Sequence, residues 1–162
     1  MSTFAQLVLY GFIPFCIFLF AFLPPHRALI WCWLLGFLFL PQGEIYFSGI
    51  PELDRTVATA YGTLAGALIF APGKLAQFRP SRWDIPMLVF CLAPAASNLA
   101  NGLSEYDAVT FALGRGLEWF VPYFLGRALL NNYRALCELA LAIVIAGILY
   151  LPLCWYEIRM SP

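Results

Sequence analysis

The residues best suited to chemistry in this chain are Arg115 and Glu118, which lie three residues apart inside a long apolar segment. Where such a segment crosses a lipid bilayer, charged groups are costly unless they are paired or face water. Residues at i and i+3 share one helix face, so these two side chains can pair. Two interpretations remain open: a structural ion pair that holds helices together, or a site in which Arg115 faces a polar cavity open to the outer side and binds an anionic group.

Three further polar residues could belong to the same site. Asn98 and Asn101 end the preceding apolar segment, where they either line a shared cavity or form the last turn of a helix. Arg127 lies further along the segment that carries Arg115. Pro122, which lies between Arg115 and Arg127, has no N–H to donate to the carbonyl of Glu118, four residues back. An unpaired carbonyl is therefore expected near mid-membrane.

The composition decides which solvent must surround these residues. Hydrophobic residues make up 62% of the 162-residue chain and charged residues 11%, against roughly 45–50% and about 25% in soluble domains. Nine basic and nine acidic residues cannot cover a water-soluble globule of this size, so the lipid bilayer is the expected main partner. The net charge is zero and no basic run occurs, which excludes nucleic acid as an expected partner.

Neither a metal nor a cofactor is expected. His26 is the single histidine and the five cysteines include no C-x-x-C spacing, so a metal site has few ligands to draw on. The sequence also lacks a P-loop, a nucleophile elbow and a dinucleotide-binding fingerprint. Catalytic residues therefore stay unassigned.

The elements that would position these residues are membrane-spanning helices, each of which needs about 20 mainly apolar residues. Six segments approach that test: 4–23, 28–40, 56–71, 85–99, 107–130 and 136–156. We expect a single all-α domain, a polytopic integral membrane bundle of about six transmembrane helices. Segment 28–40 is short and either crosses with a tilt or re-enters. In segment 56–71, Ala58, Gly62 and Gly66 share a face on which another helix can pack closely.

The positive-inside rule predicts an orientation, since short loops rich in Lys and Arg stay cytoplasmic. Alternate loops place six basic residues on one side and two on the other: Arg27, Lys74, Arg79, Arg82, Arg127 and Arg134 against Arg55 and Arg159. Both termini are therefore expected on the outer side of the membrane.

Several stretches together are similar to a known family: Asp84-Ile-Pro-Met, Ser97-Asn-Leu-Ala-Asn-Gly102, Val121-Pro-Tyr-Phe-Leu-Gly-Arg127 and Tyr150-Leu-Pro-Leu-Cys-Trp-Tyr-Glu-Ile-Arg-Met-Ser-Pro162. They resemble the N-terminal half of a bacterial branch of the O-antigen ligase and polymerase superfamily, and the resemblance covers essentially the whole chain. Members of that superfamily are polytopic proteins that transfer glycans from undecaprenyl pyrophosphate on the periplasmic side, without a metal or a nucleotide-sugar donor.

The resemblance implies a protein of surface-polysaccharide assembly in the bacterial inner membrane, with both termini periplasmic. Because the family's catalytic basic residues lie largely in later periplasmic loops, it implies that this chain is an N-terminal portion, inactive alone. The implied partners are an undecaprenyl-pyrophosphate-linked glycan and the missing C-terminal half or another membrane subunit.

Two other functions remain open. The chain could be a small non-enzymatic subunit or scaffold, with the face of Ala58, Gly62 and Gly66 as an oligomer seam. It could also be a transporter fragment, with Arg115 and Glu118 along the substrate path.

Overall fold

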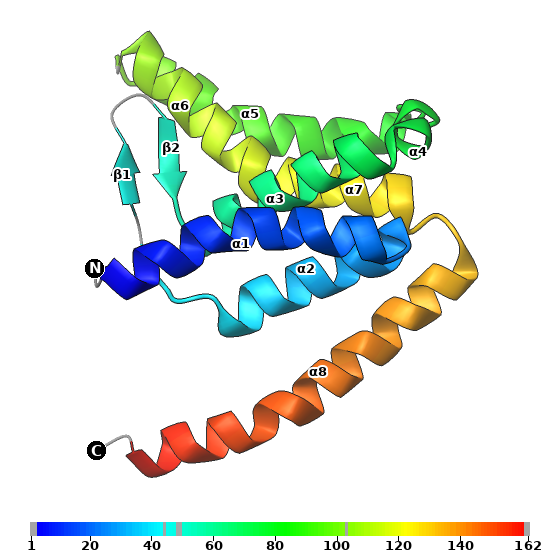
Figure 1. Ribbon diagram of the computed structural model, residues 1–162. Helices are drawn as coiled ribbons and strands as arrows, with labels where there is room; N and C mark the ends of the chain where they lie inside the picture. Colours follow the sequence, from blue (N-terminus) through cyan, green and yellow to red (C-terminus); the bar gives the residue numbers. More distant parts are fainter. Residues whose placement is uncertain (1–2, 44, 48–49, 103, 161–162) are drawn as a thin grey trace.

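The computed structural model describes residues 3–43, 45–47, 50–102 and 104–160, and these are predominantly helical (Figure 1). The elements in chain order are α1 (Thr3–Phe22), α2 (Pro25–Phe39), β1 (Ile45–Phe47), β2 (Ile50–Leu53), α3 (Arg55–Phe70), α4 (Pro72–Ala76), the 3₁₀ turn η1 (Arg82–Asp84), α5 (Ile85–Ala100), α6 (Glu105–Arg115), the π-helical turn η2 (Gly116–Phe120), α7 (Val121–Leu129) and α8 (Tyr133–Met160). The expected helical class is confirmed for the bulk of the chain. The antiparallel hairpin of β1 and β2, which joins α2 to α3, is an element that the sequence analysis does not predict.

Three helical stretches within the described residues are long and apolar enough to cross a membrane: Ala5–Phe22, Arg82–Ala100 and Tyr133–Met160. The chain is therefore compatible with a membrane protein, whereas the finer expectation of six spans goes beyond these three stretches. Helix α2 has 15 residues, and at about 1.5 Å per residue it is shorter than a hydrocarbon layer of roughly 30 Å.

Local sequence signals explain where several helices begin. Two consecutive prolines end α1, and Pro25 opens α2, where its missing N–H costs nothing. Asp54 caps α3 by accepting a hydrogen bond from the backbone N–H of Val57 at 2.7 Å. The backbone N–H of Ser81 donates to Asp84 Oδ2 at 2.7 Å, part of a capping box that holds the turn before α5.

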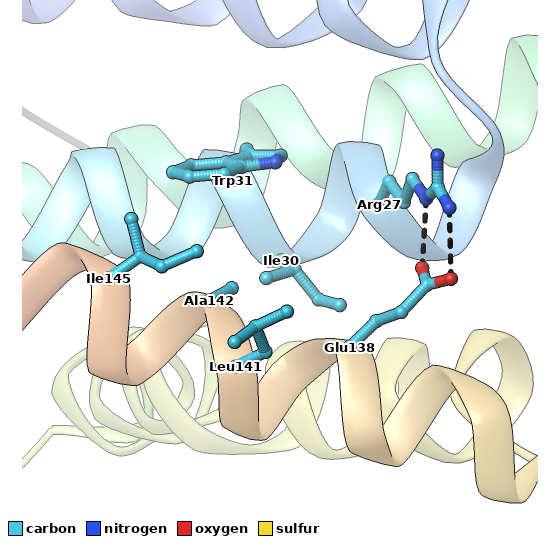
Figure 2. A pocket seen from close by; sticks show the side chains of 7 residues that line it. All are labelled: Arg27, Ile30, Trp31, Glu138, Leu141, Ala142 and Ile145. Atoms are coloured by element: carbon cyan, nitrogen blue, oxygen red, sulfur yellow. Dashed lines mark hydrogen bonds and ion pairs between the residues drawn. The ribbon is translucent and has the colours of Figure 1, made fainter.

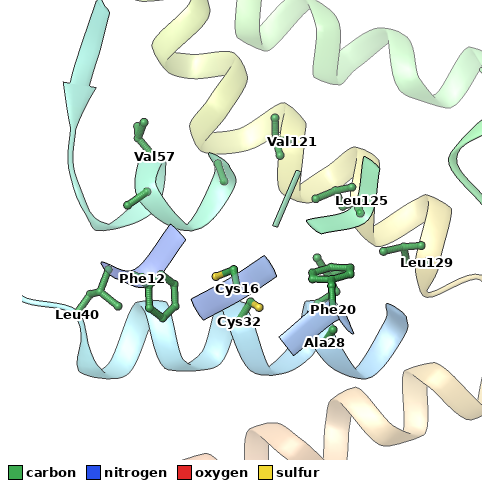
Figure 3. Packing of buried hydrophobic residues seen from close by; sticks show 14 of the residues in the cluster. Phe12, Cys16, Phe20, Ala28, Cys32, Leu40, Val57, Val121, Leu125 and Leu129 are labelled. Carbon is green, nitrogen blue, oxygen red and sulfur yellow. The ribbon is translucent and has the colours of Figure 1, made fainter. Parts of the chain in front are cut away.

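The core lies between α1, α2, α3 and α7 (Figure 3). Phe12, Cys16 and Phe20 project from α1, and Leu125 on α7 is fully buried. Helices α5, α6 and α8 surround this core with many large apolar side chains left exposed, including Val89, Phe111 and Ile148. Such an exposed apolar surface suits contact with lipid or with further helices.

The small-residue face of α3 packs against α1 within the chain. Ala58 is fully buried, and a Cβ added to Gly62 would lie 2.8 Å from the Cβ of Cys16, while one added to Gly66 would lie 2.6 Å from Cδ2 of Phe20. The two backbones approach so closely because these glycines have no side chain. Since α1 covers this face, it is not an outward-facing seam for a second copy.

The two ends of the molecule differ in character. The α1–α2 turn, α4 and the α7–α8 connection lie at one end, on the right of Figure 1, whereas the hairpin, the α5–α6 turn, the start of α1 and the end of α8 lie at the other. The segments that carry the six basic residues assigned to one side by the sequence analysis therefore meet at one end. We call it the basic end.

Candidate functional site

Arg115 and Glu118 form an ion pair, with Nη1 of Arg115 donating to Oε2 of Glu118 at 2.6 Å. Arg115 is the last residue of α6, and Glu118 lies in the π-helical turn that follows. The two side chains stay 46% and 34% exposed, so the pair lies at the surface of the described chain. Within the described residues, Arg115 has no second carboxylate partner, and part of its guanidinium is accessible to another anion.

The turn that carries this pair interrupts the expected helix 107–130. The backbone N–H of Val121 donates to the carbonyl of Gly116, five residues back, so η2 is wider than an α-helical turn. Pro122 follows directly in the first turn of α7, where its missing N–H is tolerated. π-Helical turns are rare and occur frequently at functional sites.

Contacts with α5 hold this turn in place. The thiol of Cys91 donates to the carbonyl of Arg115 at 3.7 Å, which gives that carbonyl a partner on the neighbouring helix. The ring of Trp119 meets Phe90 edge-to-face at a centroid separation of 5.9 Å. Trp119 and Leu113, within four residues of Arg115 in the chain, are both about half exposed.

The two asparagines lie toward the end of α5. Asn101 is exposed and caps the helix, with its N–H bonded to the carbonyl of Ser97 at 3.0 Å. The side-chain nitrogen of Asn98 is buried and has no hydrogen-bond partner among the described residues. Asn98 is seven residues beyond Cys91, or about 10 Å along the helix at 1.5 Å per residue. The asparagines therefore lie well beyond the turn of Arg115.

Arg127 belongs to a different cluster. Its guanidinium pairs with Oδ1 of the buried Asp84 and lies over the ring of Phe78, 5.1 Å from the ring centroid. The hydroxyl of Tyr123 donates to the same carboxylate oxygen at 2.5 Å. Twelve residues separate Arg127 from Arg115, or roughly 18 Å along a helix. The structure therefore places Arg127 at the basic end, where it joins α7 to the start of α5.

Sequence analysis misses Asp84 as the partner of this arginine. The available signal is local: a serine at position 81 and an aspartate three residues later predict a capping box, which would have marked Asp84 as an ordered carboxylate. Its pairing with a residue 43 positions away has no local signal.

A second charged cluster, also missed, joins α2 to α8. Glu138 accepts hydrogen bonds from Nε and Nη2 of Arg27 at 2.8 and 2.9 Å and from Nε of Arg134 at 3.4 Å. Nε2 of His26 lies 3.0 Å from the same carboxylate. The hydrogen bonds to Glu138 raise the pKa of Arg27 above its usual value. Only the four-residue spacing of Arg134 and Glu138 is visible in the sequence.

In the part of the chain that the structure describes, no three or more His, Cys, Asp or Glu side chains gather as metal ligands. Comparison with protein-family models, with curated proteins and with solved structures gives no match to this chain. What defines it is a helical fold with three membrane-length apolar stretches, one ion pair at a π-helical turn and two charged clusters at the basic end.

Proposed function

We propose that this chain is the N-terminal membrane portion of an O-antigen ligase-like or polymerase-like protein in the bacterial inner membrane. In this proposal Arg115 binds the pyrophosphate of an undecaprenyl-linked glycan during surface-polysaccharide assembly. The observation that carries it is the half-exposed side chain of Arg115, held by Glu118 next to a π-helical turn. The sequence resemblance supplies the class of substrate.

The charge arrangement supports an anionic ligand. Glu118 uses one carboxylate oxygen to hold Nη1 of Arg115, which restricts the rotamers of a long side chain before any ligand arrives. The remaining N–H groups of a guanidinium can donate to two phosphate oxygens at once. If the chain lies in a bilayer as proposed, Arg115 binds phosphate more strongly than an arginine in bulk water does, because the local dielectric is low.

The proposed orientation places the basic end in the cytoplasm and both termini in the periplasm, in accord with the positive-inside rule. Arg115 is ten residues from the periplasmic start of α6 at Glu105, or about 15 Å along the helix. A pyrophosphate would reach it through an opening on the periplasmic side, which the remainder of a longer protein would complete.

The test is binding of radiolabelled undecaprenyl pyrophosphate to the chain in nanodiscs of phosphatidylcholine. We expect Arg115→Gln to weaken binding by about tenfold or more, since hydrogen bonds to charged groups are each worth ~1.5–3 kcal/mol. Arg159→Gln, an exposed arginine near the end of α8, is the matched control and should bind as the wild type does.

Glu118→Gln separates the proposed site from a purely structural ion pair. The Gln amide oxygen can still accept the hydrogen bond that holds Nη1 of Arg115, while the negative charge that competes with pyrophosphate is gone. If Arg115 binds pyrophosphate, binding by this variant should therefore stay intact or tighten. The proposal would be refuted if Arg115→Gln bound pyrophosphate as well as the wild type does, while Arg115→Gln and Glu118→Gln were only less stable. The ion pair would then have a structural role alone.

A further inference from the structure

Two adjoining hollows at the basic end share the ion pair of Arg27 and Glu138. The first is a polar cup of about 300 Å³ between the α1–α2 turn, α4 and the start of α8, lined among others by His26, Lys74, Asn132 and Arg134. The second is an apolar groove of about 250 Å³ that continues from the cup between α2 and α8. The proposed function assigns nothing to either hollow.

The cup has more positive than negative charge. Arg27, Lys74 and Arg134 contribute three permanent cations, and Glu138 contributes one carboxylate. The side chain of Arg134 is 85% exposed, and its Nε lies 3.4 Å from Oε1 of Glu138. The two hydrogen bonds from Arg27 to the same carboxylate are shorter, at 2.8 and 2.9 Å. Lys74 is exposed and has no ion-pair partner among the described residues. Two cations are thus available to an anionic group.

The helix directions add to this positive field. Helix α2 begins at Pro25 and α8 begins at Tyr133, so both amino termini lie at the cup. The amino end of a helix carries a partial positive charge from its aligned peptide dipoles. Cations and helix dipoles therefore favour the same occupant, an anion.

The groove beneath the cup has a mainly apolar lining. Ile30 and Trp31 on α2 face Leu141, Ala142 and Ile145 on α8, and they lie alongside the ion pair (Figure 2). The groove lining is apolar below the charged cup, so the groove fits an acyl chain of a lipid whose polar end lies among the cations of the cup. A free phosphate would leave the groove unused.

We propose that the cup and the groove together bind one anionic phospholipid, with its phosphate among Lys74, Arg134 and Arg27 and one acyl chain between α2 and α8. Glu138 holds the Arg27 guanidinium in place through two hydrogen bonds, while Lys74 and Arg134 contact the headgroup. Basic pockets between transmembrane helices on the cytoplasmic side bind anionic headgroups in this way.

The test uses the full chain in detergent, titrated with fluorescent phosphatidylglycerol and, separately, with phosphatidylcholine of the same acyl chains. We expect phosphatidylglycerol to bind more tightly. Lys74→Gln and Arg134→Gln should each weaken its binding about fivefold, and the double variant about 25-fold, because each basic residue contributes roughly a factor of five near an anionic headgroup. Arg159→Gln, at the other end of α8, is the matched control and should leave it unchanged.

Three results would overturn the proposal. The first is wild-type affinity for phosphatidylglycerol in the double variant, and the second is equal affinity of the wild type for the two lipids. The third is displacement of the lipid by glycerol 3-phosphate at matched concentration, because the groove would then contribute nothing. The second and third measurements use the wild-type protein, so they hold even where a variant folds poorly.

Discussion

Gly62 provides the sharpest test of the packing between α1 and α3. A methyl group at this position would lie 2.8 Å from the Cβ of Cys16, 3.0 Å from its Sγ and 3.3 Å from the Cα of Ile13. Carbon atoms in contact prefer about 3.5–4.0 Å, so Gly62→Ala requires α1 to retreat by roughly 0.7 Å. Because part of the contact is with backbone, no rotamer change relieves it.

The magnitude follows from two opposing effects. Overpacking of a close contact costs about 1–3 kcal/mol, whereas replacing glycine by alanine inside a helix stabilises it by roughly 0.5–1 kcal/mol. Gly11 on α1 is the matched control, because an added Cβ there meets nothing within 4 Å. Gly11→Ala should therefore be the more stable of the two variants by about 1–3 kcal/mol.

The assay is reversible unfolding in mixed micelles, by titration with dodecyl sulfate and circular dichroism at constant total detergent. Both variants and the wild type are measured under the same conditions, so the free energies of unfolding compare directly. If Gly62→Ala were as stable as Gly11→Ala, the close approach of α1 to α3 would not exist in the folded protein and the reasoning would fail.

Two further predictions concern single side chains. Tyr123→Phe removes the hydroxyl that donates to the buried Asp84 and should lower the melting temperature by a few degrees. The control Tyr106→Phe, at an exposed position, should leave the melting temperature unchanged. Equal melting temperatures of the two variants would contradict the hydrogen bond. Exposed Cys137 should react with a membrane-permeant maleimide in the folded protein, whereas fully buried Cys16 should react only after unfolding. Mass spectrometry of the labelled peptides checks this, and equal labelling would show that Cys16 is accessible.

The helical character of the chain was predictable because it depends on local composition. Long apolar runs predict the helices, and local residues mark their ends. Pro24 and Pro25 separate α1 from α2, and Asp54 caps the start of α3, whatever the rest of the chain does. The i, i+3 spacing likewise predicts that Arg115 and Glu118 can pair, since both partners lie within one turn. The break of this segment at a π-helical turn was not predicted, because it depends on how Pro122 is accommodated.

Contacts between segments far apart in the chain could not be predicted from the sequence. Spacing marks Gly62 and Gly66 as a close-packing face, but only the fold shows that α1 covers it. The same holds for Arg127, which pairs with Asp84 rather than lying with Arg115, and for Arg27, which pairs with Glu138 on α8.

The amino-acid sequence alone therefore determined the helical character and the local ion pair of this protein, because apolar content and i, i+3 spacing act over a few residues. Tertiary structure decided which charges meet and which faces remain open. Those outcomes depend on how helices far apart in the chain pack side by side, and a single sequence carries no local signal for that packing.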